Sequence, residues 1–171
     1  INPVPSDGVS FEFVSAGPNH NCGTYNGSNG LHCWGLAPPG LAAGLPNQNV
    51  TSPQLITNTR DAGLIPHNQI ATSNQATCYN TLSGSVVCFG SNASGIIAPT
   101  TQESYADPVV YGGLNNVTEI TLYSNSPLAR VVRGTACAIA DEGLVCWGSN
   151  ADYRTGWTPP VVQIDPPPIE E

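Results

Sequence analysis

Two short apolar runs joined by a turn recur three times along the chain and set its organisation. In residues 131–150 (VVRGTACAIADEGLVCWGSN) the runs are 136–140 and 144–147, with Asp-Glu-Gly between them. A glycine-containing turn between two β-prone runs predicts a β-hairpin. Residues 14–35 and 70–92 repeat the pattern, and all three copies carry an aromatic residue followed by glycine in the second arm. The pattern therefore predicts a repeat protein built from hairpins.

Further strands are predicted outside the hairpins. Residues 117–123 (VTEITLY) alternate apolar and polar side chains, which is typical of a half-buried strand, and residues 9–14 and 70–72 are also expected to be extended. No window shows a sustained helical period, and the chain contains 18 Gly and 16 Pro. These two residues usually make up about 12% of a protein, and their higher share in this chain favours short strands and turns over helices. The predicted fold class is all-β.

A second period concerns prolines that precede apolar segments, at separations of 50, 55 and 52 residues. We take each such segment as the opening of a unit within one repeat domain, residues 1–171. Units of this size with several short strands are typical of propeller blades or arrays. The prolines are Pro3, Pro53, Pro108 and Pro160, and the units are 3–52, 53–107 and 108–159, with 160–171 as the start of a fourth unit and a Pro-rich tail.

All six cysteines fall in the predicted hairpins, one on each arm. The repeat selects the pairing that joins the two arms of each hairpin: Cys22 with Cys33, Cys78 with Cys88, and Cys137 with Cys146. A metal site is the alternative, but paired zinc ligands usually lie about two to four residues apart, closer than any of these pairs. Three disulfides indicate an oxidising compartment.

The charge argues against two classes of partner. The net charge is −8, with four basic residues, so no basic surface is expected for nucleic acid or for an anionic membrane. No apolar run approaches the roughly 20 residues needed to span a bilayer, so membrane insertion is not expected.

Four sequons for N-glycosylation fit secretion from a eukaryotic cell. With the paired cysteines they predict a secreted, extracellular or cell-surface glycoprotein. The alternative is that these asparagines simply form turns, a reading that suits Asn26 and Asn92 equally well. The sequons begin at Asn26, Asn49, Asn92 and Asn116.

The three copies share a motif, found at 14–17, His20, Cys22 and 33–35, at 70–71, Cys78 and 88–92, and at Cys137 and 146–150. Ala76 and Thr135 stand where the first copy has His20. The motif resembles the repeat of the regulator of chromosome condensation family, in particular its secreted, cysteine-paired members such as plant crinkly-type receptor ectodomains and bacterial extracellular propellers. The resemblance implies an open or partial propeller of three disulfide-stapled blades with a spare C-terminal strand. Three blades cannot close the larger ring that the family usually forms.

No set of residues predicts catalysis. His20 and His32 flank the first disulfide and could face each other across the hairpin, but no third metal ligand lies at a suitable spacing. The chain has no Gly-x-Ser-x-Gly elbow and no phosphate-binding glycine-rich motif, and its 12 carboxylates are scattered. We predict no enzymatic activity, no catalytic residue, no metal and no cofactor.

An incomplete ring leaves strand edges open, and an open edge is a template for pairing with another chain. We therefore expect a non-enzymatic extracellular structural glycoprotein whose partners are copies of itself or another extracellular protein, joined head to tail in a filament or a ring. The alternatives are a ligand-recognition module (receptor ectodomain, adhesin or lectin-like propeller) and a fragment of a longer propeller. The expected joining residues are Pro160, Val161, Val162, Ile164, Phe11 and Phe13.

Overall fold

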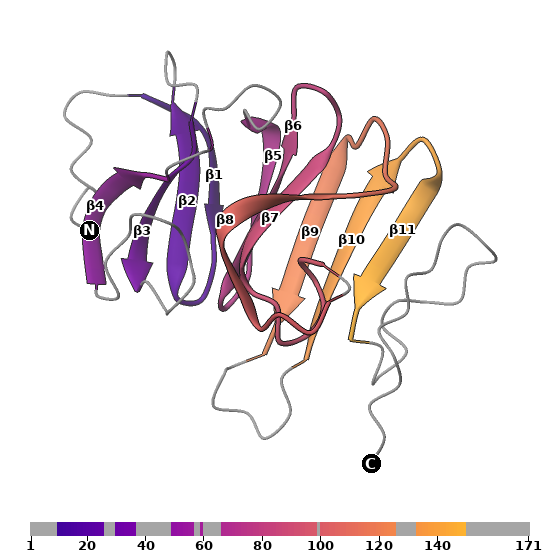
Figure 1. Ribbon diagram of the computed structural model, residues 1–171. Coiled ribbons are helices and arrows are strands. Elements are labelled where there is room, and N and C mark those ends of the chain that lie inside the picture. The colour runs from indigo at the N-terminus through magenta and orange to yellow at the C-terminus, as the bar shows by residue number, and fades with distance from the viewer. Residues whose placement is uncertain are drawn as a thin grey trace.

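The computed structural model describes residues 10–25, 30–36, 49–56, 59, 66–98, 100–125 and 133–149, except for the side chain of His67. Every regular element in these ranges is a strand, and the strands form three separate antiparallel sheets (Figure 1). The predicted all-β class is confirmed, with three open sheets, one for each hairpin copy.

Within each sheet, strands that follow one another in the chain are neighbours. Sheet 1 contains β1 (Phe11–Ala16), β2 (His20–Tyr25), β3 (His32–Leu36) and β4 (Asn49–Leu55). Sheet 2 contains β5 (Pro66–Thr72), β6 (Ala76–Thr81), β7 (Val86–Ser91) and β8 (Ser104–Tyr111). Sheet 3 contains β9 (Glu119–Ser124), β10 (Gly134–Ala140) and β11 (Gly143–Gly148).

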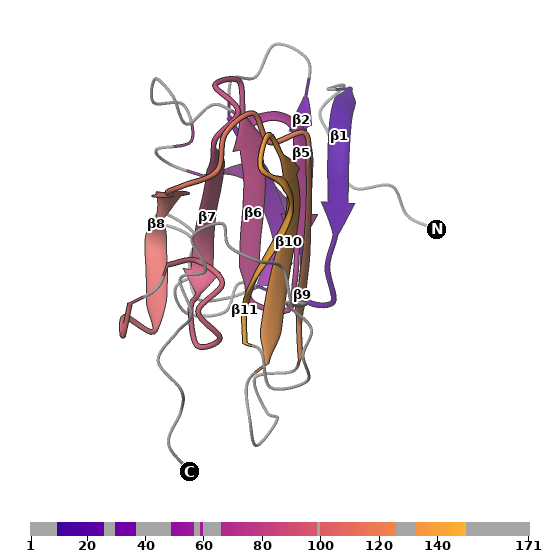
Figure 2. The same cartoon turned by 90° about the vertical axis from the view of Figure 1, so that its right-hand side faces the viewer.

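The sheets stack in chain order. Strand β5 contacts both β1 and β9, so the first strands of the three sheets lie side by side. Sheet 2 is therefore covered on both faces, whereas sheets 1 and 3 form the two ends of the stack. Figure 2 shows the stack from the end formed by sheet 3.

The sheets begin at a different strand from the units expected from the prolines. Pro53 lies in β4 and Pro108 in β8, which are the last strands of sheets 1 and 2, not the openings of the next ones. A period fixes the length of a repeat but not the strand at which it begins, which explains the difference. The segment at Pro160, expected to be a spare strand, lies outside the described residues.

The three disulfides join the pairs expected from the repeat, and each bridges two directly opposed residues of a hairpin. The Cα atoms of each pair are 4.1 Å apart. A bridge that closes a loop of roughly ten residues contributes about 2.5–3 kcal/mol in the chain-entropy model. The disulfides thus stabilise hairpins that bury little apolar surface by themselves.

The backbone conformation explains why a glycine follows each of the three aromatic residues. Gly35, Gly90 and Gly148 have φ angles of 116°, 109° and 109°, a region that side chains disfavour. A Cβ atom at Gly90 would also lie 2.3 Å from the carbonyl oxygen of Gln75. The glycine of each repeated aromatic-glycine pair therefore has a backbone conformation that glycine adopts most easily.

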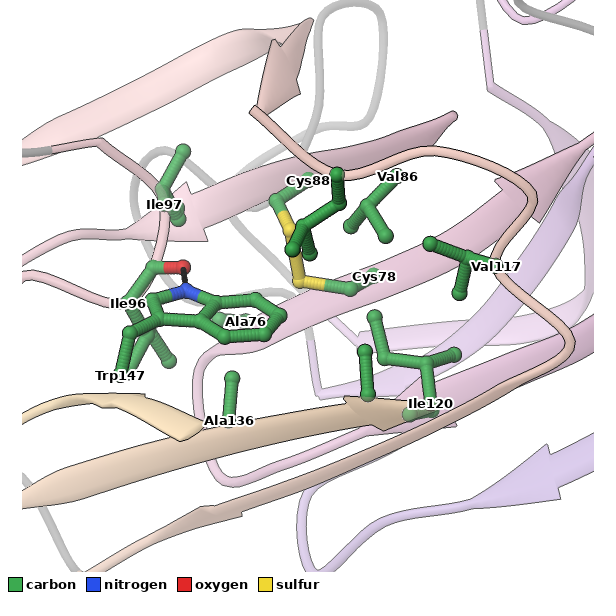
Figure 3. Packing of buried hydrophobic residues seen from close by; sticks show 13 residues of the cluster. Ala76, Cys78, Val86, Cys88, Ile96, Ile97, Val117, Ile120, Ala136 and Trp147 are labelled. Atoms are coloured by element: carbon green, nitrogen blue, oxygen red, sulfur yellow. Dashed lines mark hydrogen bonds between the residues drawn. A yellow bond between two sulfur atoms is a disulfide. The ribbon is translucent and has the colours of Figure 1, made fainter. Parts of the chain in front are cut away.

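Two apolar clusters hold the sheets together. Between sheets 1 and 2, Cys22, Leu31 and Cys33 pack against Tyr79, Val87 and Phe89. Between sheets 2 and 3, the Cys78–Cys88 disulfide and Val86 pack with Ile120, Ala136 and Trp147 (Figure 3). The Trp147 indole Nε1 donates a hydrogen bond of 2.9 Å to the carbonyl oxygen of Ile96.

His20 is fully buried at the interface between sheets 1 and 2. Its Nε2 lies 2.8 Å from Thr77 Oγ1, while its Nδ1 has no hydrogen-bond partner among the described residues. Burial disfavours the charged imidazolium and lowers the pKa of His20 from 6.5 to about 4. The interface therefore contains a neutral histidine at physiological pH.

We expect Gly90→Ala to lower the free energy of unfolding by about 3 kcal/mol or more, because backbone strain adds to the overlap with Gln75. Gly113→Ala is the matched control, since Gly113 has a φ of 89° but open space at its Cβ position. It should cost only about 1–2 kcal/mol. Denaturant unfolding measures both, and equal losses would contradict the tight contact at Gly90.

Protonation of His20 should destabilise the fold in acid. Its pKa is 6.5 when exposed and about 4 in the folded state, so between these values the unfolded chain binds more protons. The free energy of unfolding should then fall as the pH drops from about 6.5 towards 4, by up to roughly 3 kcal/mol from this residue. We expect the stability difference between wild type and His20→Gln to shrink over this range, and parallel pH curves would refute the assignment.

Candidate binding surfaces on the outer faces of the end sheets

The disulfides of sheets 1 and 2 each face the next sheet along the chain. Cys22 and Cys33 of sheet 1 belong to the cluster with Tyr79 and Phe89 of sheet 2. Cys78 and Cys88 of sheet 2 belong in turn to the cluster with sheet 3. All four cysteines are fully buried. A disulfide together with the apolar residues around it is therefore the surface on which the following sheet packs.

In sheet 3 the corresponding surface faces away from the stack. Ala136 and Ala138 of β10 are buried against sheet 2, and side chains alternate along a strand, so Cys137 and Ile139 lie on the opposite face. Cys137 and Cys146 are only half-buried, and Ile139 is exposed. We call this surface, made by Thr135, Cys137, Ile139, Leu144 and Cys146, the disulfide face.

Leu144 shows the difference most clearly. It stands two residues before the second cysteine of its hairpin, the position of Leu31 in sheet 1 and Val86 in sheet 2. Leu31 and Val86 are 0% exposed in the two inter-sheet clusters, whereas Leu144 is 63% exposed. A side chain of core type thus lies in the open at the end of the stack.

The other end of the stack presents aromatic rings. Phe11 packs against Tyr25 and Trp34 with ring centroids 5.1 and 5.4 Å away, and Tyr25 lies 4.1 Å from the His32 ring. Phe11, Tyr25 and Trp34 are half-buried. We call Asn21, Gly23 and these four rings the aromatic face of sheet 1.

Trp34 belongs to a repeated position with two environments. Phe89 and Trp147 occupy the same place in their hairpins, and both are buried between sheets. At Phe89 and Trp147 the repeated aromatic residue thus packs between neighbouring sheets. Trp34 has no preceding sheet among the described residues, so its ring remains on an open face.

The expected joining residues fall in different places. Phe11 contributes to the aromatic face, and Phe13 is exposed on β1. Pro160, Val161, Val162 and Ile164 lie outside the described residues. Leu144 and Ile139 were not anticipated, although alignment of the three hairpins on their cysteines would have marked Leu144 as equivalent to Leu31 and Val86.

His20 and His32 do not face each other, so the arrangement considered for a metal site is not formed. His20 lies opposite Gly35 and points to sheet 2, whereas His32 lies opposite Gly23 and stacks on Tyr25 at the outer face. Alternation along the strands separates the two rings. In the described part of the chain, no group of three or more His, Cys, Asp or Glu residues is arranged to hold a metal ion.

No helix in the described ranges has the length and apolarity needed to cross a membrane.

Carboxylates on the surface act as hydrogen-bond acceptors for neighbouring amides. Asn115 Nδ2 donates to Glu142 Oε1 at 2.8 Å, and this bond lowers the pKa of the Glu142 carboxyl. Asn116 Nδ2 donates to Asp141 at 2.6 Å. These contacts tie the β8–β9 connection to the hairpin of sheet 3.

The sequon asparagines differ in accessibility. Asn49 and Asn116 are exposed, and Asn26 lies outside the described residues. Asn92 is buried, and its side-chain amide donates to the carbonyl oxygens of Ala98 and Gln102 at 2.9 and 3.0 Å. Its Oδ1 accepts from the backbone N–H groups of Ile97 and Ala98. Asn92 thus organises the loop after β7 and leaves no room for a glycan.

In a eukaryotic secretory host, Asn49→Gln and Asn116→Gln should each remove the mass of one glycan, because both asparagines are accessible. Asn92→Gln should leave the glycan mass unchanged but lower the free energy of unfolding by about 2–3 kcal/mol through its lost hydrogen bonds. Intact mass before and after enzymatic deglycosylation tests this. Loss of a glycan in the Asn92 variant would contradict the buried arrangement.

No protein-family model matches the chain, and no curated protein sequence matches it. Solved structures do align with it. Human WBSCR16 aligns at 16% identity and a TM-score of 0.57, over 81% of this chain and 33% of WBSCR16. Yeast RCC1 (Prp20) bound to Kap60 aligns at 17% identity and 0.63, over 88% and 35% of the two chains. A second structure, Prp20p from Saccharomyces cerevisiae, gives 18% identity and 0.62, over 88% and 36%.

The ectodomain of the Arabidopsis thaliana receptor kinase ACR4 aligns at 19% identity, over 85% of this chain and 53% of the ectodomain. Its TM-score of 0.40 is too low to bear on the fold. The chain spans about a third of the WBSCR16 and Prp20 chains, at 33–36% of their length. At these identities the likeness concerns architecture alone: the three sheets are arranged like neighbouring blades of the propellers in these structures.

Proposed function

We propose that this chain is a non-enzymatic extracellular structural module that binds protein through the outer faces of its end sheets and thereby joins copies of itself. The observation that carries the proposal is Leu144, which is 63% exposed where its counterparts are fully buried. Large apolar side chains gathered on one open face mark protein interaction sites.

The disulfide face has the composition of an interface. It combines the exposed Leu144 and Ile139 with the half-buried Cys137–Cys146 disulfide. Burying an aliphatic side chain of this size completely contributes about 1.5–3 kcal/mol. The aromatic face at the other end adds large rings, which supply much of the binding energy in protein interfaces. Both ends of the stack can therefore bind another surface favourably.

The disulfides support an extracellular location. Three bridges and no free cysteine fit an oxidising environment outside the cytosol. Glycans on the accessible Asn49 and Asn116 would agree with secretion. The negative charge disfavours nucleic acid as the partner.

Structures of similar fold support a role in protein binding. Yeast Prp20 has been crystallised with Kap60, and its binding to Gsp1p and histones has been described. Those partners belong to that protein. For this chain they support only the general point that blades of this type present surfaces to other proteins.

Recognition of a small ligand by a receptor, adhesin or lectin-like module is the second candidate. The aromatic face favours it, because partly accessible rings such as Trp34 can stack on the apolar faces of sugars or on peptide side chains. A chain that stays monomeric while its tryptophan fluorescence responds to a glycan or peptide would favour this candidate over assembly.

We expect the wild-type chain to show a mass that rises with concentration in native mass spectrometry or sedimentation. Leu144→Asp should weaken this association at least about tenfold, since a contact of about 1.4 kcal/mol or more is lost. The matched control is Leu82→Asp, because Leu82 is 67% exposed but lies in the hairpin turn of sheet 2, outside both end faces. A wild type that is monomeric at all concentrations, or two variants that behave alike, would refute the proposal.

A further inference from the structure

We propose that the disulfide face of one copy binds the aromatic face of sheet 1 in a second copy, so that copies join head to tail through two different surfaces. This inference rests on the proposed function and names the partner of each face. It comes from the two internal interfaces, which use equivalent residues and which the end faces continue.

One side of each internal interface is formed by a disulfide and the residue two positions before its second cysteine. In sheet 1 these are the Cys22–Cys33 bridge and Leu31, and in sheet 2 the Cys78–Cys88 bridge and Val86. Sheet 3 has the same set in the Cys137–Cys146 bridge and Leu144, on its open face.

The opposite side of each interface is formed by the aromatic residue after the second cysteine and by its neighbours. Phe89 of sheet 2 packs towards sheet 1, and Trp147 of sheet 3 packs towards sheet 2. Trp34 is the equivalent residue of sheet 1, and no described sheet covers it. Each end of the stack therefore presents a surface equivalent to one side of the two interfaces between the sheets.

Phe11 completes the aromatic face. Gly23 of sheet 1 stands at the position that Tyr79 occupies in sheet 2, and it has no side chain to offer. A Cβ atom at Gly23 would lie 2.7 Å from Phe11 Cδ1, so the Phe11 ring covers the space above Gly23. An aromatic surface is thus present in sheet 1 as it is in sheet 2, although a different strand supplies the ring.

The two internal interfaces favour a contact between the disulfide face of one copy and the aromatic face of another over a contact between two like faces. Neither internal interface joins two disulfide surfaces or two aromatic surfaces, and a two-fold contact would have to do one or the other. A contact between unlike faces is heterologous, and it extends into a filament unless the rotation between copies closes a ring. Because each copy carries a net charge of −8, association should strengthen with ionic strength.

Mixing of complementary variants tests the polarity. The double variant Ile139→Asp with Leu144→Asp blocks the disulfide face, and Trp34→Asp blocks the aromatic face. Each should be monomeric alone, and a 1:1 mixture should form a dimer and nothing larger, measured by sedimentation with intact disulfides as the folding control. Asn21→Arg, a surface change on the aromatic face, replaces Trp34→Asp if the latter does not fold.

The outcomes separate the two proposals. If wild type does not assemble, the proposed function fails. If wild type assembles but a single blocked variant still dimerises alone, or the mixture stays monomeric, the head-to-tail assignment is overturned while self-association stands. If the only assemblies are formed with added protein of another kind, the second-copy assignment is also overturned.

Thiol labelling gives a second readout that does not depend on mass. Mild reduction followed by alkylation should label Cys137 and Cys146 at least severalfold more slowly in assembled wild type than in the monomeric disulfide-face variant. Cys22 and Cys33, which are buried within each copy, should be labelled at the same slow rate in both. Equal labelling of Cys137 and Cys146 in the two states would overturn the assignment.

Discussion

The packing of one sheet on the disulfide of the sheet before it is the interaction on which this structure depends. Each hairpin is cross-linked, but one repeat cannot bury its apolar face without a neighbouring repeat. Phe89 and Trp147 supply the large rings that cover the preceding sheets, and the glycine after each ring turns the backbone where a side chain would collide. The fold therefore depends on two equivalent interfaces between sheets and not on one central core.

This repeated architecture explains which features could be predicted from the sequence. The hairpins, the disulfide pairs and the all-β class follow from local signals: turn residues, apolar runs and paired cysteines. The strand at which a sheet begins did not follow, because the prolines give the period without its phase, and Pro53 and Pro108 lie in closing strands.

The environment of individual side chains was harder to foresee, because alternation along a strand does not say which face meets a neighbour. His20 and His32 flank the same disulfide yet point to opposite faces. Asn92 fits a sequon and a turn equally well in the sequence, and only the hydrogen bonds of its side chain to the loop after β7 show that it is structural. The candidate faces depend on such differences between equivalent residues.

Stacked repeats usually end in a capping unit with a polar outer face, which keeps the array soluble and stops its growth. Sheet 3 does not have this character: its outer face carries Leu144 and Ile139, and the Cys137–Cys146 disulfide is half-buried on it. Sheet 1 likewise ends in rings instead of charges. Neither end of the described stack is therefore a capping unit. Both ends carry the types of side chain that pack between the sheets, so burying these side chains against another surface is favourable.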